Sequence, residues 1–361
     1  MDFSLTEEQQ AVADLAAQIF TGHATVERIK DIEASEDRVD RELWAELAKA
    51  NLLAIGLPEQ YGGSDLDIVA ICALLEQQGR RVAPVPLWPT LVLAALPIAH
   101  FGTDAQREAW LPGIGRGEVV ATAALEDITD ASFVEGGGGW RLSGTKLSVP
   151  AAHLASVMLV PAGGRTFLVD PRGPGVQLER AETTNRSIAC HVVLDDAPGD
   201  PLGTRDGAAD EVLAWLMPRA LVGLCAMQVG VAEEAIRMAA SYTSGRIQFG
   251  KPLSTFQGAA LKAADGYIDS EAMRVTMWHA AWLLAAGRDA IAEVEVAKWW
   301  ASEAGQRVVH TTQHLHGGLG ADIDYPIHRY FLWGKQIEDT LGGASAHLAR
   351  LGAVLAERGQ R

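Results

Sequence analysis

The sequence predicts a mainly helical protein with a smaller β region in its middle. Three observations support this fold class. Apolar residues recur at helical spacing over the first hundred or so residues; β-prone runs divided by Gly, Pro and Asp turns fill the region from about 118 to 203; and Ala- and Leu-rich helical sequence runs from Asp210 almost to Arg361. A length of 361 residues corresponds to two or three domains, which we place at 1–117, 118–203 and 204–361.

The N-terminal region is predicted to consist of helices joined by short turns. Ser4 and Glu7 have the spacing of a capping box, and apolar residues follow at helical intervals as far as Phe20. A second helix is predicted after Asp65, and one of its faces carries Ile68, Cys72 and Leu75.

The longest uncharged stretch of the chain is VAPVPLWPTLVLAALPIAHFG. Each of its prolines removes an amide donor that a membrane-spanning helix would use, so we expect buried helix and turns here. The N-terminus, MDFSLTEEQQ, is acidic where a secretory signal would be basic. We therefore expect neither export nor a membrane association.

Short β-prone runs define the middle region. They are WRLSGTKLSV, ASVMLV, RTFLVD and HVVLDD, and turn residues separate them. The glycine run from Gly136 to Gly139 is expected to form a hairpin tip. After Asp210 the helical pattern is broken mainly at SGRIQFGKPLS and at HGGLGADIDYP, and long helices with short breaks indicate a helical bundle.

Composition excludes several classes of function. A formal net charge of -16, without any basic block, argues against a nucleic-acid partner, because such binding depends on clustered Lys and Arg. Cys72, Cys190 and Cys225 lie far apart, so the sequence contains neither a readable zinc site nor a disulfide framework. A reducing, cytoplasmic location is expected.

Four segments carry a resemblance to a known family. LPEQYGGSDLD, FGTDAQREAWLPGIGRGE, SGRIQFGKPLSTFQ and LHGGLGADIDYPIHRYF occur in the order and spacing found in acyl-CoA dehydrogenases. The sequence resembles that family over essentially its whole length. The third segment is the most specific, because it combines Arg246, the Phe249–Gly250 pair and Gln257 in a break between two bundle helices.

The resemblance implies an N-terminal helical domain, a small middle β-barrel domain and a C-terminal four-helix bundle. It also implies a chemistry, in which a glutamate removes the α-proton of an acyl-CoA thioester while the β-hydride passes to FAD. An electron-transfer flavoprotein then reoxidises the flavin. Hydrogen bonds at the thioester carbonyl stabilise the charge that develops during this step.

By resemblance, one group of residues contacts FAD. Arg246 would meet the pyrophosphate, for which a planar guanidinium is well suited, Phe249 would pack on the cofactor, and Gln257 would bind near the adenosine. Gln248 lies between them and is assigned to the same site. The alternative is that Arg246 caps a helix C-terminus and Phe249 belongs to the core.

A glycine turn would complete this half of the flavin site. Gly317, Gly318 and Gly320 would allow backbone amides to approach the cofactor, whereas an isolated GGLG would be an ordinary turn. The family carries a Gln three positions before the glycine pair, and here that position holds His314, with Gln313 one residue earlier.

The flavin-ring half departs from the family pattern. The family's Leu-Thr-Glu-Pro segment corresponds here to AALEDITD, which keeps Glu126 but replaces the Thr by Leu125. An aromatic residue and a hydroxyl that usually follow the next strand fall on Ser148 and Pro150. Neither stretch reproduces the usual contacts.

The catalytic base is also absent from both positions that the family uses. Counting from Gly317 leads to Leu341, and counting from Gly230 leads to Ala220; neither side chain accepts a proton. Glu338 and Asp339 lie near Leu341, and either a relocated base or a solvated helix end is consistent with them.

Three functions are compatible with this pattern. The first is a subunit of a hetero-oligomeric, FAD-dependent acyl-CoA dehydrogenase, which lacks the base and donates flavin contacts to a homologous catalytic partner, as in paired actinobacterial enzymes acting on bulky CoA thioesters such as sterol side chains. The second is a self-sufficient flavoenzyme with a displaced base or with oxidase or monooxygenase chemistry. The third is a flavin-free structural homologue. His316 and His328 form no readable triad or metal motif, so packing or hydrogen bonding is expected of them.

Overall fold

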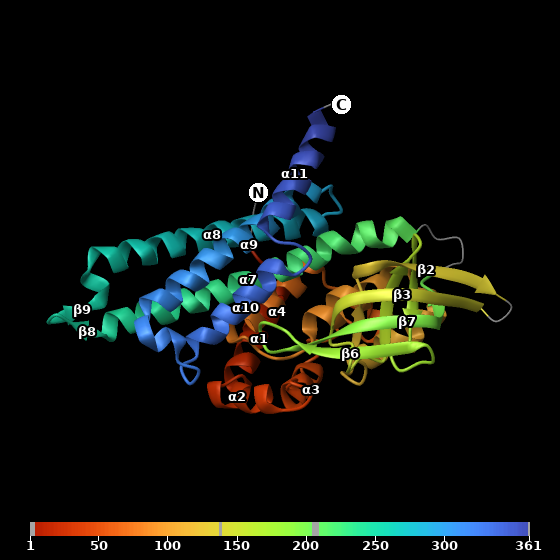
Figure 1. The fold of residues 1–361 in the computed structure, drawn as a ribbon, viewed down its shortest axis with the longest axis horizontal. Coiled ribbons are helices and arrows are strands. Elements are labelled where there is room, and N and C mark those ends of the chain that lie inside the picture. The colour runs from red at the N-terminus through yellow and green to blue at the C-terminus, as the bar shows by residue number, and fades with distance from the viewer. Residues whose placement is uncertain (1–3, 137–138, 204–208, 360–361) are drawn as a thin grey trace. The chain divides into compact units, whose positions relative to one another are not determined.

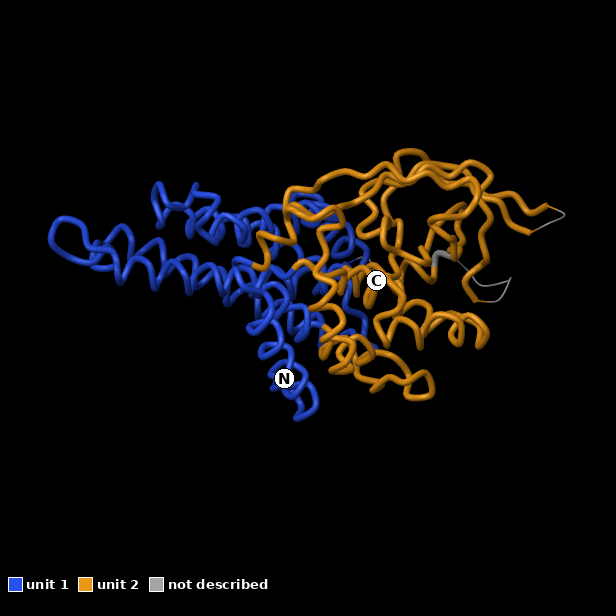
Figure 2. Tube along the Cα trace, turned by 90° about the horizontal axis from the view of Figure 1, so that it is seen from below, with its two compact units in different colours: residues 1–27, 72–83, 221–361 blue, residues 28–71, 84–220 orange. Residues whose placement is uncertain are grey.

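A computed structural model describes residues 4–136, 139–203 and 209–359 (Figure 1). Helices precede and follow a region of strands, in agreement with the predicted fold class. The chain divides into two compact units, neither of which is continuous in sequence (Figure 2). Unit 1 contains residues 1–27, 72–83 and 221–361, and unit 2 contains residues 28–71 and 84–220.

The first helix, α1 (Glu7–His23), begins two residues later than the predicted capping box requires. Thr6 is the N-cap: its hydroxyl oxygen accepts the amide of Gln9 at 3.2 Å, and the Gln9 side chain accepts the Thr6 amide at 3.0 Å. The prediction of a box between Ser4 and Glu7 is therefore wrong. Both pairs have the required spacing, but the Thr6 box buries Gln9 together with Val12, Ala16 and Phe20.

Two further helices precede the helix predicted after Asp65. They are α2 (Val26–Ala34) and α3 (Arg41–Lys49), and the Asp40 carboxylate caps α3 by accepting two backbone amides. The predicted helix is α4 (Ile68–Arg81), with Ile68, Cys72 and Leu75 all buried as expected. The charged residues of α2 and α3 hide their helical periodicity, which explains why the sequence predicted neither of these two helices.

The uncharged proline-rich stretch forms buried helix, as predicted. A π-helix, η2 (Trp88–Ala95), continues into α5 (Leu96–Phe101), and α6 (Asp104–Gly115) follows after a Thr103 cap. Every residue of η2 is buried. The Thr90 hydroxyl donates to the carbonyl of Ala121 at 3.1 Å, which fixes this segment to the first strand of the sheet.

Unit 2 also holds one curled seven-stranded sheet in the order β1-β4-β5-β7-β3-β2, with β6 paired to β7. Four predicted runs correspond to β3, β4, β5 and β7, whereas β1, β2 and β6 were not predicted. Strands β2 and β3 meet at the Gly136–Gly139 pair, and the hairpin tip predicted there lies at 137–138, outside the described residues. The strands are β1 (Ala121–Ala123), β2 (Glu126–Gly136), β3 (Gly139–Pro150), β4 (Val157–Ala162), β5 (Arg165–Val169), β6 (Val176–Glu182) and β7 (Ile188–Pro201).

The concave side of the sheet encloses its own apolar core. Leu142, Met158 and Phe167 are fully buried within it, and Phe133 and Trp140 cover its edge. Burial of such side chains, at about 25 cal/mol per Å² of apolar surface, is the main force that holds the strands together.

Unit 1 is built from long helices, as the bundle prediction requires. These are α7 (Ala209–Gly245), α8 (Gln257–Ala285), α9 (Ile291–Leu315), α10 (Ile327–Asp339) and α11 (Ala344–Gly359), with α9 packed against α8, α10 and α11 (Figure 1). The breaks at SGRIQFGKPLS and HGGLGADIDYP fall between α7 and α8 and between α9 and α10. Boundaries between the two units fall inside α2, α4 and α7.

Close packing of α4 on α7 depends on two glycines of unit 1. A Cβ on Gly79 would overlap the carbonyl oxygen of Met227, and a Cβ on Gly230 would overlap that of Glu76. By length and composition α7 could cross a membrane, but two thirds of its most apolar window, 67%, is buried inside the protein, as in the core helix of a bundle.

Candidate functional site

The predicted cofactor-contacting segment begins where α7 ends. The amide of Arg246 donates to the Tyr242 carbonyl at 2.8 Å, and the chain then forms a tight hairpin from β8 (Ile247–Gln248) and β9 (Lys251–Pro252). Its two connecting residues, Phe249 and Gly250, have φ values of 51° and 79°. A two-residue hairpin with both central residues at positive φ suits Asn-Gly or Gly-Gly, so a phenylalanine is unusual here.

Phe249 carries a steric cost that the folded chain does not offset. A left-handed backbone costs roughly 1–2 kcal/mol for a residue with a Cβ. The Phe249 side chain is 92% exposed, so no burial of its ring compensates that cost. The Phe256 ring lies next to it, with the two ring centroids 6.2 Å apart. The Lys251 ammonium lies over the Phe256 ring in a cation–π contact, 4.4 Å from its centroid. The Phe249 ring is therefore available for contact with a molecule outside this chain, and the alternative of a core phenylalanine is wrong.

The polar residues of the same segment are exposed as well. Arg246, Gln248 and Gln257 all face solvent, with Gln257 at the start of α8. Arg246 takes part in no ion pair among the described residues, whereas most other arginines of the chain do. The Gln248 side chain donates only to the Ile247 carbonyl, at 2.9 Å. An unpaired guanidinium beside an exposed aromatic ring is suited to an anionic ligand.

The predicted glycine turn follows α9 directly. Gly317 has a φ of 61°, which disfavours a side chain, and a Cβ on Gly320 would overlap the Gln313 carbonyl oxygen. The Gln313 side-chain amide donates to the Gly320 carbonyl at 2.9 Å and closes the turn. No atom lies within 4 Å of a Cβ placed on Gly318, and His314 is exposed. The turn thus presents open backbone to solvent.

The two histidines near this turn are buried and hydrogen-bonded, as predicted. His316 Nδ1 lies 2.7 Å from the Thr312 carbonyl, and His328 Nδ1 lies 2.7 Å from the Tyr325 carbonyl. The prediction of packing or hydrogen bonding for both is confirmed.

Leu341 lies in the short connection between α10 and α11. It is buried and has a φ of 59°, and Gly342 follows with a φ of 109°. The connection is fixed by Lys298 of α9, whose side chain is fully buried. Its ammonium donates to four oxygens, namely the carbonyls of Ile337 at 3.1 Å, Glu338 at 3.0 Å and Gly342 at 3.0 Å and the Ser302 hydroxyl at 2.8 Å.

Electrostatics make this arrangement favourable despite the burial of a charge. A cation at the C-terminal end of α10 meets the negative end of the helix dipole. Burial lowers the pKa of Lys298 to about 8, which still leaves the ammonium protonated near neutral pH. A second pair, His347 Nδ1 with Glu295 at 2.6 Å, fastens α11 to α9 beside it. Contacts with α9 therefore fix the connection that carries Leu341.

One of the two acidic residues near Leu341 is engaged elsewhere, because the Glu338 carboxylate pairs with Lys335 at 2.5 Å. Asp339 is exposed, and its backbone carbonyl accepts the Gly342 amide at 3.1 Å. Ala220, the other expected base position, lies on α7 in unit 2 and is fully buried. Its carbonyl accepts the Trp88 indole N–H at 3.0 Å. Neither Ala220 nor Leu341 carries a proton-accepting group.

The segment expected near the flavin ring forms part of the sheet in unit 2. Leu125 precedes β2, which begins at Glu126, and Asp127 pairs at 2.6 Å with the fully buried Lys146 of β3. The Lys146 ammonium also donates to the Pro161 carbonyl at 2.6 Å. These contacts fix the start of β2 as an edge strand of the sheet.

The second ring segment is also saturated by internal bonds. The Ser148 amide donates to His191 Nδ1 at 3.3 Å, and Ser148 has a φ of 44°. Pro150 has no amide hydrogen, and its carbonyl accepts the Thr122 hydroxyl at 2.6 Å. Little backbone hydrogen-bonding capacity is left here for a ligand.

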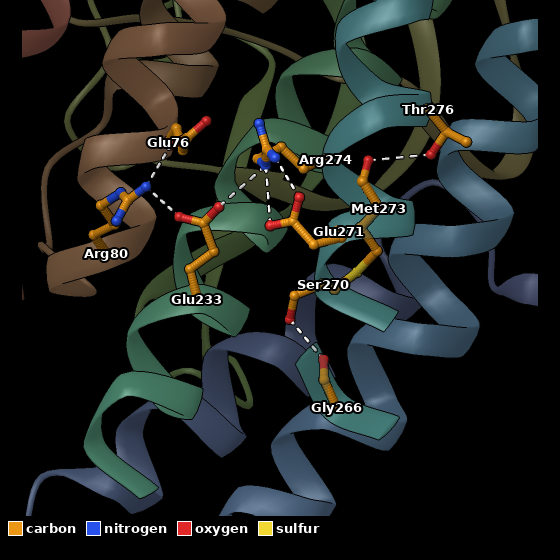
Figure 3. A network of polar contacts seen from close by, with 9 residues as sticks. All are labelled: Glu76, Arg80, Glu233, Gly266, Ser270, Glu271, Met273, Arg274 and Thr276. Carbon is orange, nitrogen blue, oxygen red and sulfur yellow. Dashed lines mark hydrogen bonds and ion pairs between the residues drawn. The ribbon is translucent and has the colours of Figure 1, made fainter. Parts of the chain in front are cut away.

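Sequence reasoning missed an ionic network in unit 1 (Figure 3). Arg80 of α4 contacts both Glu76 and Glu233, and Arg274 of α8 bridges Glu233 and Glu271. Burial, reinforced by Glu76, raises the pKa of Glu233 to about 7. The network joins α4, α7 and α8. No local sequence motif predicts the network, since Arg80 and Glu233 are 153 positions apart.

The described residues contain no group of three or more His, Cys, Asp or Glu side chains suited to a metal ion. Cys72, Cys190 and Cys225 are buried, and none of them forms a disulfide.

Comparison with known proteins identifies relatives over the whole chain. The model of the acyl-CoA dehydrogenase N-terminal domain matches residues 6–118, and that of the acyl-CoA dehydrogenase C-terminal domain matches residues 212–353. The acyl-CoA dehydrogenase FadE27 of Mycobacterium tuberculosis is 38% identical over 99% of both chains.

Two solved structures are closely similar. The Tcur3481-Tcur3483 steroid ACAD, a G363A variant, shares 50% identity with a TM-score of 0.93 and covers 98% of this chain and 99% of that one. The ChsE4-ChsE5 complex from Mycobacterium tuberculosis shares 37% identity with a TM-score of 0.94 and covers 99% of each chain. The second is a complex of ChsE4 with ChsE5, and PigA, which has the same fold at 20% identity and a TM-score of 0.88, is solved with FAD.

Proposed function

The chain belongs to the acyl-CoA dehydrogenase family, and on that premise we propose that it is the non-catalytic subunit of a hetero-oligomeric, FAD-dependent acyl-CoA dehydrogenase. It lacks a base and completes the flavin site of a homologous catalytic partner. One observation carries the proposal: the residues assigned to the cofactor are exposed, and Arg246 forms no ion pair among the described residues, while both base positions are apolar and buried.

The proton of the reaction must be accepted outside this chain. Ala220 and Leu341 offer only aliphatic groups, and the Glu338 carboxylate is already paired with Lys335. A general base must come within hydrogen-bond reach of the proton that it removes. We therefore assign that role to a glutamate of the partner.

The hairpin and glycine turn fit the diphosphate side of FAD. Arg246 supplies a planar cation for two phosphate oxygens, and Gly317 and Gly318 are exposed, with open space where a Cβ would lie at each. Phe249 offers its exposed ring to the cofactor, and Gln248, Gln257 and His314 provide exposed polar groups around it.

The residues expected at the flavin ring do not fit this role. The Ser148 amide and Pro150 carbonyl have partners within the sheet, and Leu125 replaces the hydroxyl that the family uses. Each unsatisfied polar group of a bound ligand costs about 1–3 kcal/mol. The ring contacts therefore come from the partner, which explains why two chains are needed for one site.

When bound, FAD supplies the acceptor for the hydride that leaves Cβ of the acyl group. The residues of this chain bind and orient the diphosphate side, and the partner's glutamate takes the α-proton. Relatives named as steroid ACADs favour a bulky, sterol-type acyl-CoA as the substrate. We assign reoxidation to an electron-transfer flavoprotein in the cytoplasm.

An apolar stripe on α8 supports a partner subunit. Leu261, Ile268 and Val275 are all exposed and recur every seven residues, which places them along one side of the helix. Exposed apolar residues in such a row typically mark a protein contact. The stripe lies on the helix that starts at Gln257.

A turnover assay tests the proposal. The chain, a homologous subunit that carries the glutamate, and their mixture are each supplied with an acyl-CoA and an artificial electron acceptor. We expect turnover only where both chains are present. Full activity of this chain alone would contradict the proposal and favour a self-sufficient enzyme with a displaced base.

A further inference from the structure

We propose that His316 is a positioning residue that holds the Arg246–Gly250 hairpin and the Gly317–Gly320 turn in one fixed arrangement. The inference rests on the proposed flavin site, because these two segments carry its diphosphate contacts. They are separated by more than sixty residues of sequence, so their alignment depends on tertiary contacts.

Stacked rings connect the two segments. The His316 imidazole stacks on Tyr242 with a centroid distance of 4.6 Å and an interplanar angle of 23°. Tyr325 packs against both rings, at 5.2 Å from His316 and 6.4 Å from Tyr242. Tyr242 belongs to the last turn of α7, and its carbonyl accepts the Arg246 amide at 2.8 Å. A displacement of His316 would therefore reach the base of the hairpin through one ring and one hydrogen bond.

The imidazole also fixes the start of the glycine turn. Thr312 belongs to the last turn of α9, where backbone carbonyls lack helical partners, and His316 Nδ1 lies 2.7 Å from its oxygen. A carbonyl only accepts, so Nδ1 carries the proton. Gly317 enters the left-handed region immediately afterwards, at a φ of 61°. The ring is thus oriented at the residue where the turn begins.

The imidazole is retained at an energetic cost. His316 is 2% exposed, and its Nε2 atom is buried without a hydrogen-bond partner among the described residues. Burial lowers the pKa of His316, so the ring is neutral near pH 7. The titratable groups that face it are Tyr242 and Tyr325. A neutral ring can stack closely between two aromatic neighbours.

The consequence for binding is geometric. A diphosphate that is held at one end by a guanidinium and at the other by backbone amides tolerates little relative movement of the two groups. Loss of the His316 ring should lower the affinity of the complex for FAD by about tenfold. The conservative His316→Phe variant keeps the ring and should restore most of that affinity, although it lacks the bond to Thr312.

The experiment uses the complex with its homologous partner and four forms of this chain. They are the parent, His316→Ala, His316→Phe and the control His310→Ala. His310 lies on the same helix, with Nδ1 2.8 Å from the Gln306 carbonyl and its ring against Phe331, but it contacts neither segment. FAD retention on dilution and hydrogen–deuterium exchange over residues 244–256 and 313–322 are measured for each form.

We expect His316→Ala to speed exchange in both segments and to release FAD, while His316→Phe and the control behave like the parent. Exchange in the hairpin that stays unchanged in His316→Ala would overturn the proposal, and so would a phenylalanine variant as defective as alanine. If His316→Ala does not fold, Tyr242→Leu removes the same contact from the other side and must give the same pattern. A parent complex without FAD would contradict the proposed function, whereas the exchange data would still test the coupling.

Discussion

The end of α7 and the end of α10 differ in whether their polar side chains have partners within the chain. At the α7 end, the hairpin leaves Arg246 unpaired and Phe249 almost fully exposed. At the α10 end, Lys298 is fully buried and donates to four oxygens around the connection that carries Leu341. The first region can contact a molecule outside the chain, whereas the polar groups of the second region are hydrogen-bonded within the chain.

The exposed hairpin at the end of α7 is suited to binding a ligand, whereas the buried Leu341 after α10 offers no group for proton transfer. A strained, exposed residue such as Phe249 lowers stability unless an external contact offsets its cost. The connection at Leu341 has the opposite character, because its polar groups are satisfied internally and its central side chain is apolar. On the proposed function, this chain keeps the ligand contacts of the family site, while the base position is part of its core.

The largest expected effect concerns the proton acceptor. Glu338→Gln and Asp339→Asn should keep turnover of the complex within a few times that of the parent. Replacing the partner's glutamate should lower turnover by about a hundred to ten thousand times, the usual contribution of a general base. Steady-state assays with an artificial electron acceptor measure both. If either conservative change in this chain abolishes turnover while flavin stays bound, the base lies here and the comparison above fails.

The next effect concerns the closed region. Lys298→Met removes the ammonium donor from the Ile337 and Gly342 carbonyls and from the Ser302 hydroxyl, which should destabilise the chain by about 3 kcal/mol. The Glu338 carbonyl keeps the Ser302 hydroxyl as a donor. Lys335→Met is the matched control, because Lys335 forms a more exposed pair with Glu338 and should cost less than about 1 kcal/mol. Urea denaturation midpoints of the two variants compare them directly. Equal losses would show that Lys298 does not hold the connection.

A substitution in the exposed hairpin should change the affinity for FAD and leave the stability of the chain unchanged. Arg246→Ala removes a charge-assisted contact to the diphosphate, worth about 1.5–3 kcal/mol, or roughly one to two decades of FAD affinity. Arg116→Ala, which removes another exposed arginine that pairs only with Glu118, serves as the control. Flavin retained on dilution reports the difference. Unchanged retention in Arg246→Ala would support the helix-cap reading of this residue.

The remaining prediction is a pH dependence that belongs to the ionic network of Figure 3. The pKa of Glu233 is about 7 in the folded chain and near 4.5 in the unfolded one, so the folded state holds the proton to higher pH. Stability should therefore fall as pH rises from about 4.5 to 7, by at most about 1.4 kcal/mol per pH unit from this group. Denaturation midpoints between pH 5 and 8 measure the slope, and Glu233→Gln should flatten it. An unaltered slope would exclude Glu233 as its source.

Much of the fold could be predicted because local patterns determine it. The runs that became β3, β4, β5 and β7 are apolar enough to be read as strands. By contrast, β2 is exposed along most of its length, so it carries no alternation between buried and exposed positions. Charged residues likewise obscured α2 and α3. Thr6 is the N-cap instead of Ser4 because that start of the helix buries the residues that follow it. A rule based on spacing alone does not include burial.

The candidate site was predictable where a motif is continuous in sequence. The family resemblance assigned the hairpin residues from Arg246 to Gly250 and the glycine turn to the site, because each lies in one continuous segment of sequence. The contacts of Lys298 could not, because three of its four acceptors are backbone carbonyls, which every residue type possesses. The stacking of His316 on Tyr242 likewise joins residues that are distant in sequence, and no local pattern predicts it.

The visible absorption spectrum of this chain, purified alone and then with its homologous partner, tests the central claim most directly. On the proposed function, the hairpin and turn supply one half of a flavin site, and the partner supplies the half that Leu125, Ser148 and Pro150 do not. The account predicts little or no flavin absorption for the chain alone and a yellow complex with bound FAD. A stoichiometric flavin band in the chain purified alone would contradict it.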